Sequence, residues 1–185
     1  QRLAMTTFIA LLRGINVGKS RRVSMEELRS LLGGLGYAEV STLLNSGNAV
    51  FRAAGGTARH HAAAIAQALA AQMQVDVPVI VVASDDLAAI VHENPLTASA
   101  TDPSRLLVAF AQDAQALGAL DRIGALAKPP DPFALGPRAA YLHCAGGILE
   151  SKAGKALLGK AGQAVTTRNW ATVLKLHGLA QPTSA

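Results

Sequence analysis

Cysteine and aromatic residues are scarce in this sequence, and long apolar runs are missing. Cys144 is the single cysteine among 185 residues, which excludes an internal disulfide framework and a cysteine-based zinc site and favours a reducing compartment. Aromatic residues make up 4% of the chain, so few rings are available to stack on nucleic-acid bases. No apolar run reaches the length of a membrane-spanning helix, and no charged-then-apolar signal segment leads the chain. We therefore expect a soluble, cytoplasmic protein without a membrane partner.

Acidic residues are also in the minority, and their distribution is uneven. Residues 1–83 carry eight lysines and arginines against four acidic residues, residues 84–145 carry four against seven, and residues 146–185 carry five against one. The basic ends, in a chain whose net charge is +5, would suit an anionic partner, although a solvated surface is the simpler explanation of such charge. The hydrophobic content of 50% is ample for a core, and the length suits one large or two small domains.

The most unusual stretch is the basic, glycine-punctuated turn Arg13–Arg22. It follows the apolar run Thr7–Leu12, which is typical of a strand covered on both faces, and it precedes a capping box at Ser24. Gly14 and Gly18 supply backbone freedom and leave N–H groups uncovered, while four cations add positive charge. With a helix N-terminus nearby, these features predict a site for a small anion that carries phosphate or carboxylate.

The same turn resembles the P-loop motif G-x-x-x-x-G-K-[ST] but is one residue short. In a P-loop the helix begins at the Lys-Ser/Thr pair, so that these side chains face the phosphates and Mg²⁺. Here the helix cap comes later, at Ser24. A P-loop nucleotidase is therefore not the favoured interpretation.

Hydrophobic periodicity predicts the element order β-α-β-β-α-β in residues 5–83. Strands 39–44 and 48–52 are joined through Asn45-Ser46-Gly47 as a hairpin, and helices are expected over 24–35 and 57–73. A β-branched strand over 77–82 closes the series. This is the order of the ferredoxin-like, split βαβ fold.

The order then repeats after a short helix that starts at Ser84 or Asp85. Further strands are predicted over 105–111, 133–135, 140–144 and 164–166, with helices over 114–127 and 151–160 and a last helix from Thr167 to about Gly178. We predict an α+β protein of two ferredoxin-like halves with antiparallel sheets and helices packed on one face. The halves are 5–83 and 84–181, the second including a linker helix and the C-terminal helix, and we expect them to form one compact unit.

Five motifs follow one another along the chain: Leu11-Leu12-Arg13-Gly14-Ile15-Asn16-Val17-Gly18, Leu44-Asn45-Ser46-Gly47-Asn48-Ala49-Val50-Phe51, Asn94-Pro95, Ser151-Lys152, and Thr167-Arg168-Asn169-Trp170-Ala171-Thr172-Val173. Together they resemble the bacterial family called domain of unknown function 1697, over about Thr6 to Ala180. The resemblance implies a duplicated ferredoxin-like fold. It implies no catalytic role, because the family's activity is not established. Lys19 and Ser20 stand where that family more often has a second glycine and a polar residue.

The candidate ligand-binding residues come from both basic ends of the chain. Arg13 could clamp a phosphate or carboxylate bidentately or form a structural ion pair. The asparagines are better explained as turn builders, because their side chains bond the nearby backbone. The predicted set is Arg13, Gly14, Asn16, Gly18, Lys19, Ser46 and Asn48, completed by Lys152 and Arg168 from the second basic end.

No catalytic constellation, metal site or cofactor is predicted, and whether the protein is an enzyme stays open. Ser46 lacks the G-x-S-x-G context of a hydrolase nucleophile. The adjacent His60 and His61 would point about 100° apart on a helix, and the remaining histidines lack metal-ligand spacing. Trp170 would anchor the last helix or line a pocket.

Two other functions remain open. An RNA- or single-stranded-DNA-binding module is one, because RRM domains share the ferredoxin-like order and the chain is basic. The scarcity of aromatic residues argues against this function, since the expected first and third strands offer only Phe8 and Phe51 for stacking on bases. The other is a ferredoxin-like dimerising regulatory domain, which would use a sheet edge or face. A monomer or a homodimer is therefore expected.

Overall fold

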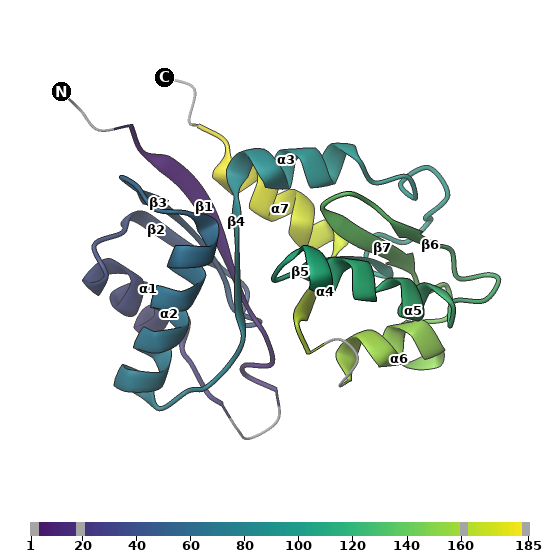
Figure 1. Ribbon diagram of the computed structural model, residues 1–185, viewed down its shortest axis with the longest axis horizontal. Coiled ribbons are helices and arrows are strands. Elements are labelled where there is room, and N and C mark those ends of the chain that lie inside the picture. The colour runs from purple at the N-terminus through teal and green to yellow at the C-terminus, as the bar shows by residue number, and fades with distance from the viewer. Residues whose placement is uncertain (1–3, 18–20, 160–162, 183–185) are drawn as a thin grey trace. The chain divides into compact units, whose positions relative to one another are not determined.

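The computed structural model describes residues 4–17, 21–159 and 163–182. It has two four-stranded antiparallel sheets accompanied by helices, in two similar halves (Figure 1). The α+β class with antiparallel sheets is thus confirmed. By its internal contacts the chain divides into two compact units, Gln1–Leu87 with Leu176–Ala185, and Ala88–Lys175. Of the helices in the described ranges, none combines the length and apolar character that a membrane crossing needs.

The first unit is built on a sheet with the strand order β2-β3-β1-β4. β1 is antiparallel to β3 on one side and to β4 on the other. The elements are β1 (Thr6–Leu12), α1 (Met25–Gly34), β2 (Ala38–Leu43), β3 (Asn48–Ala53), α2 (Ala58–Met73) and β4 (Val79–Ala83). The element order predicted for this part of the chain is confirmed.

Local sequence signals set where these elements begin. The Ser24 Oγ accepts the N–H of Glu27 at 3.1 Å, which confirms the predicted cap of α1. Thr57 caps α2 in the same way. The predicted hairpin through residues 45–47 joins β2 and β3, with Ser41 opposite Val50.

One face of the first sheet packs against α1 and α2 (Figure 1). β1 contributes Phe8, Ala10 and Leu12 to this core, because alternate residues of a strand point to the same face. Thr7, Ile9 and Leu11, which alternate with them, therefore face the opposite side of the sheet. The other main contributors to the core are Ala49, Phe51, Leu28, Leu31, Leu32, Ile65 and Leu69.

The second unit repeats the same topology, with the strand order β6-β7-β5-β8. Its core joins sheet residues such as Leu107 and Leu142 to Ile123 and Leu157 from the helices. The elements are β5 (Leu106–Ala111), α4 (Ala114–Ala119), α5 (Asp121–Gly124), β6 (Phe133–Leu135), β7 (Ala139–His143), the 3₁₀ turn η1 (Ile148–Glu150), α6 (Lys152–Leu158) and β8 (Val165–Asn169). Two further helices, α3 (Ser84–His92) and α7 (Trp170–Ala180), contain the boundaries between the units.

Two predicted boundaries in this half are wrong. The last helix starts at Trp170 rather than Thr167, because Arg168 pairs with Val108 and continues β8. The Asn169 Oδ1 then accepts the N–H of Thr172 at 2.9 Å and starts the helix. The helix predicted over 114–127 is divided at Leu120, where hydrogen bonds to the residue three positions earlier replace the α-helical pattern.

Candidate functional site

The turn after β1 is tied to two neighbouring strand ends. The N–H of Leu12 donates to Gly47 O at 2.9 Å, and the N–H of Arg13 donates to Pro78 O at 3.0 Å. Beyond these bonds the backbone enters the left-handed region at Gly14 (φ 71°) and Asn16 (φ 56°). Gly14 suits this conformation because it has no Cβ to clash. Gly18 and Lys19, which belong to the predicted site, lie outside the described residues.

Asn16 holds the turn in shape through all the polar atoms of its side chain. Its Oδ1 accepts the N–H of Val23 at 2.9 Å, and its Nδ2 donates to Val23 O at 2.8 Å and to Asn45 O at 2.7 Å. A ligand would have to compete with these three bonds for the amide. Asn16 therefore joins the Arg13–Arg22 turn to the β2–β3 hairpin.

The hairpin turn on the other side is equally constrained. Asn48 is fully buried, and its Nδ2 donates to Leu43 O at 2.8 Å and to Ser46 Oγ at 2.9 Å. At Gly47, which has a φ of 92°, an added Cβ would lie 2.8 Å from the Cβ of Leu12. Ser46, Gly47 and Asn48 thus shape the support on which the basic turn rests.

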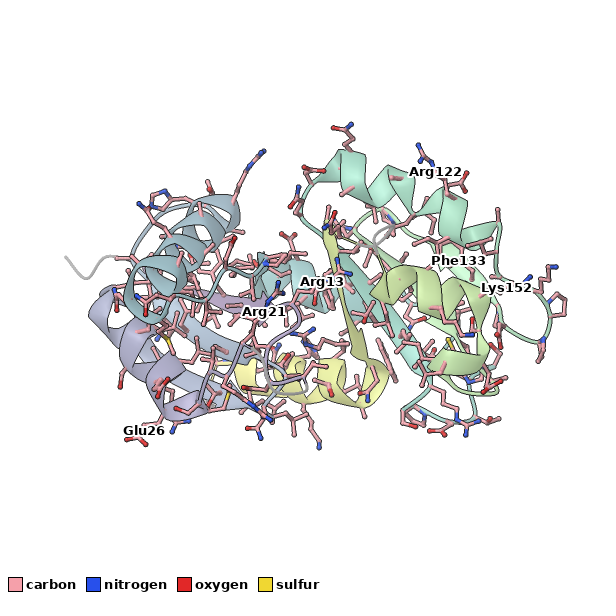
Figure 2. All side chains as sticks on the ribbon, turned by 90° about the horizontal axis from the view of Figure 1, so that it is seen from below. Arg13, Arg21, Glu26, Arg122, Phe133 and Lys152 are labelled. Carbon is pink, nitrogen blue, oxygen red and sulfur yellow. The ribbon has the colours of Figure 1, made fainter. Side chains whose placement is uncertain are left out.

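One guanidinium group lies close to Gly14. The Nη1 of Arg21 is 3.7 Å from the position that a Cβ on Gly14 would occupy. Arg13 is the residue before this glycine, and Figure 2 labels both arginines. Arg13 is partly buried, and this burial lowers the pKa of its guanidinium. Within the described residues, the N–H groups of Gly14 and Ile15 donate no hydrogen bond. The turn thus combines positive charge near Gly14 with two backbone N–H groups that have no acceptor among the described residues.

Arg21 is absent from the predicted set of site residues. The sequence shows it as one of four loop cations, and nothing in its spacing places it against Gly14. Its own left-handed backbone, with a φ of 55°, turns the chain at this residue. Such a conformation is uncommon for arginine and is not readable from composition.

The two residues predicted from the second basic end belong to the other unit. Lys152 is exposed and is the first residue of α6, whose cap Ser151 accepts the N–H of Gly154 at 3.0 Å (Figure 2). Arg168 is only 8% exposed, and its Nη1 donates to Thr166 Oγ1 and to Thr167 O, both at 2.8 Å. Burial lowers the pKa of Arg168 to about 10. That these two residues complete the site at Gly14 stays a prediction.

A cavity of about 750 Å³ lies at the end of the basic turn, between α1 and α2. Arg22 lines it, but so do Glu26 and Glu27. The two carboxylates disfavour an anion there. This cavity therefore does not suit the anion that the sequence predicts at the turn.

The aromatic side chains of the first sheet are covered. Phe8 is 4% exposed and Phe51 is fully buried, and their ring centroids lie 5.7 Å apart in the core beneath the helices. His61 closes the cluster: its Nδ1 accepts the hydroxyl of Tyr37 at 2.8 Å, and its Nε2 donates to Gly55 O at 2.7 Å. The carbonyl oxygen of Gly55 can only accept a hydrogen bond, so the proton of the imidazole is on Nε2 and Nδ1 is the acceptor. Neither phenylalanine presents a face on which a base could stack.

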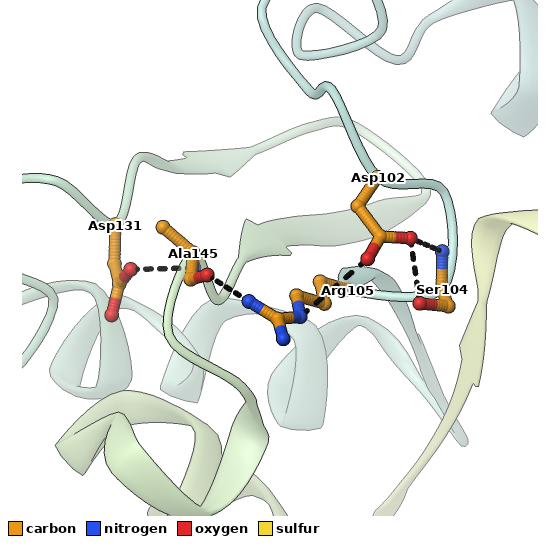
Figure 3. Close-up of polar contacts among 5 residues, drawn as sticks. All are labelled: Asp102, Ser104, Arg105, Asp131 and Ala145. Carbon is orange, nitrogen blue, oxygen red and sulfur yellow. Dashed lines mark hydrogen bonds and ion pairs between the residues drawn. The ribbon is translucent and has the colours of Figure 1, made fainter.

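In the second unit, a network of polar contacts holds three loop segments together (Figure 3). Its members are Asp102, Ser104, Arg105, Asp131 and Ala145. Asp102 accepts two hydrogen bonds from Ser104, at 2.9 and 2.6 Å, and these hold the pKa of its carboxyl below the usual range. The Nε of Arg105 lies 3.5 Å from the Oδ2 of Asp102, and the Nη1 of Arg105 donates to the backbone oxygen of Ala145. The N–H of Ala145 in turn donates to the Oδ1 of Asp131 at 2.8 Å. These bonds join the segment before β5, the segment before β6 and the segment after β7. No group of three potential metal ligands is found in the residues that the structure describes.

The comparisons with known proteins give a fold and a family. No curated protein matches the chain. The chain is similar to the structure of the conserved bacterial protein SP0830 from Streptococcus pneumoniae, with a TM-score of 0.81 and 23% sequence identity, covering 96% of this chain and 100% of that one. At this identity the likeness shows the fold alone. The family model described as protein of unknown function (DUF1697) matches residues 5–141, well over half of the chain. The chain therefore belongs to this family, as its motifs indicated.

Proposed function

We propose that the turn Arg13–Arg22 binds a small anionic ligand through a phosphate or carboxylate group. The observation that carries this proposal is the Nη1 of Arg21, 3.7 Å from the Cβ position of Gly14, with Arg13 next to that glycine. A guanidinium presents a planar fork of donors that matches the oxygens of both groups. The N–H groups of Gly14 and Ile15 would add backbone donors to the same oxygens.

Partial burial strengthens the case for Arg13. Its guanidinium is partly buried, so the protein replaces part of the water around it, and this burial lowers its pKa. An anion interacts more strongly with such a charge than with a fully hydrated one, because the effective dielectric constant is lower. Arg13 would therefore supply more of the affinity than an exposed arginine of the same loop.

The other predicted residues would have different roles: some would hold the turn in shape and others would add positive charge. Asn16, Ser46 and Asn48 would hold the turn in place through the bonds described above, without touching the ligand. Lys19 and Lys152 would add positive charge. Arg168 would contribute only if its buried guanidinium reached the ligand, and its bonds to Thr166 and Thr167 favour a structural role.

We further take both halves to be ferredoxin-like. In each sheet the first strand of the repeat lies between the third and the fourth, and the second strand lies at an edge. This order is the one that the β-α-β-β-α-β connection produces when all neighbours are antiparallel. RRM domains share that order, so the nucleic-acid alternative deserves a direct comparison.

Binding of RNA or single-stranded DNA is the weaker proposal. RRM domains stack bases on exposed aromatic residues of the sheet. Phe8 and Phe51 are instead buried against the helices. A basic turn without a stacking platform suits a small ligand better than a nucleic-acid strand.

Thermal unfolding with candidate ligands tests the proposal. We would heat the full chain with inorganic phosphate, pyrophosphate, nucleotides, sugar phosphates, carboxylates and short RNA, at low and high salt. A ligand at about 100 times its Kd should add roughly 2.7 kcal/mol to the free energy of unfolding. We expect at least one small anion to raise the midpoint at both salt concentrations. A shift caused by RNA alone, with a steep salt dependence, would favour the alternative.

Three variants locate the effect. Arg21→Gln and Arg13→Gln remove one guanidinium each from the turn and should abolish the stabilisation by the anion. Arg122→Gln is the matched control, because Arg122 is an exposed arginine of α5 in the other unit (Figure 2). If Arg21→Gln and the control respond to the ligand alike, the turn is not the binding site.

A further inference from the structure

A second cleft lies within the first unit, at the opposite end of β1 from the basic turn. Its volume is about 670 Å³, within the range of ligand pockets. Thr6, the first residue of β1, lines the cleft, whereas the basic turn follows Leu12, the last residue of the strand. Six residue steps along a strand span roughly 20 Å. The cleft is therefore separate from the proposed anion site.

The floor of the cleft is the sheet face that turns away from α1 and α2. Thr7 pairs with Arg52 and Ser41 pairs with Val50. Phe51, between Val50 and Arg52, belongs to the core on the helix side. Since side chains alternate along a strand, Thr7, Ser41, Val50 and Arg52 all lie on the opposite face.

The walls come from segments that are distant in the sequence. α3 contributes its first two residues, Ser84 and Asp85, and β2 contributes Glu39. The end of α7 supplies Leu179, whose side chain is 48% exposed and apolar. The remaining lining residues are Met5, Gly178, Ala180, Gln181 and Pro182.

Charges of both signs line the cleft. Arg52 is the cation among its lining residues, and Glu39 and Asp85 are the anions. The Nη1 of Arg52 lies 3.3 Å from the Oε2 of Glu39, in a pair that is partly open to solvent. The Nε of Arg52 is buried and has no hydrogen-bond acceptor among the described residues. This one N–H of an otherwise partly exposed side chain is thus without an acceptor, which is uncommon for a buried donor atom.

We propose that this cleft binds a zwitterionic α-amino acid with an apolar side chain. The carboxylate would bind Arg52, since the planar fork of guanidinium N–H groups donates to both oxygens of a carboxylate. The ammonium group would lie between Glu39 and Asp85, and the side chain would contact Leu179. Two carboxylates beside one guanidinium disfavour a phosphate or another plain anion, whereas a ligand with both charges complements the lining.

Titration calorimetry of the full chain with leucine, valine, methionine and phenylalanine tests this assignment. We expect saturable binding of at least one of them at millimolar concentration or below. Leucine amide lacks the carboxylate and N-acetyl-leucine lacks the ammonium group, so both should bind at least about tenfold more weakly than leucine. Absence of binding by all four amino acids, or binding of either blocked form as tightly as leucine, overturns the proposal.

Variants separate the cleft from the rest of the surface. Arg52→Gln and Asp85→Asn should each weaken binding by about tenfold or more. Arg59→Gln is the matched control, because Arg59 is an exposed arginine of α2 that does not line the cleft. Circular dichroism verifies that each variant is folded, and the Arg52–Glu39 pair is open enough to water that its loss should change stability little. Unchanged affinity in Arg52→Gln refutes the assignment.

Discussion

The side chain of Asn16 donates a hydrogen bond to the backbone oxygen of Asn45 at 2.7 Å, across 29 positions of the sequence. This bond connects the basic turn after β1 to the hairpin turn between β2 and β3. Both turns belong to the motifs by which the family was identified. Their contact explains why the two segments work as one structural unit: the hairpin supports the turn that carries Arg13 and Arg21.

Replacement of Asn16 by alanine should destabilise the first unit. The change removes three hydrogen bonds and leaves the N–H and the C=O of Val23 without their side-chain partner. We expect a loss of about 2 to 4 kcal/mol in the free energy of unfolding, measured by urea denaturation. Asn45→Ala is the control, because the bond uses the backbone oxygen of Asn45, and it should lie within about 0.5 kcal/mol of wild type. Equal losses in both variants would contradict the role of the Asn16 amide.

Gly47→Ala should be among the most harmful single changes to the hairpin. The added Cβ would lie 2.8 Å from the Cβ of Leu12 and 2.9 Å from the Cδ1 of Ile15, at a backbone φ of 92°. Strain and overpacking together should cost about 2 to 5 kcal/mol. Gly33→Ala is the matched control in α1, where an added Cβ meets nothing within 4 Å. It should stabilise the protein by up to about 1 kcal/mol, and chemical denaturation compares the two variants.

Tyr141 should make the stability of the second unit depend on alkaline pH. Its hydroxyl donates to Ile90 O at 2.7 Å, and burial raises its pKa to about 12. The raised pKa favours the neutral form in the folded state. The resulting stabilisation is complete below the unfolded pKa of about 10 and is lost as pH rises towards the folded pKa.

The difference between wild type and Tyr141→Phe isolates this effect from other titrating groups. Below pH 9 the variant should be less stable by about 1 to 2 kcal/mol, because Ile90 O loses a donor. The gap should narrow as the pH rises above 10. A gap that stays constant up to the alkaline limit of reversible unfolding would argue against a buried, neutral hydroxyl.

Arg168 and Lys152 should differ sharply when each is replaced by alanine. Arg168 is buried in β8 and bonds to Thr166 and Thr167, so its loss should cost about 2 to 4 kcal/mol in unfolding free energy. Lys152 is exposed at the start of α6, and its loss should change stability by less than about 0.5 kcal/mol. Thermal unfolding distinguishes the two outcomes, and a neutral Arg168→Ala would instead free this residue for a ligand role.

Much of the fold could be predicted from local patterns. Ser24 marked the start of α1 through its side-chain cap, and residues 45–47 marked the hairpin, because turn and capping chemistry act over a few residues. The boundary at Trp170 could not be found in this way. Thr167 to Asn169 suit a helix or a strand, and pairing with β5, about 60 positions earlier in the chain, decides between them.

The candidate site could be predicted as a region of the chain but not as a geometry. The glycines and cations between Arg13 and Arg22 predict an anion site, because uncovered backbone N–H groups and positive charge in one turn favour an anion. The position of Arg21 near Gly14 depends on left-handed backbone conformations at Gly14, Asn16 and Arg21, which the sequence does not reveal. The cleft around Arg52 escaped prediction for another reason: it gathers residues from five elements, and each looks ordinary in its own segment.

The central claim is that an anion binds at the turn between Arg13 and Arg21. Amide NMR during a titration with the small anion that stabilises the protein best, or with pyrophosphate, tests it most directly, because every N–H reports its own surroundings. We predict saturable shifts of the Gly14 and Ile15 amides in wild type, and their loss in Arg21→Gln but not in Arg122→Gln. Shifts that do not saturate, or that centre on residues outside the turn in both variants, would contradict the account.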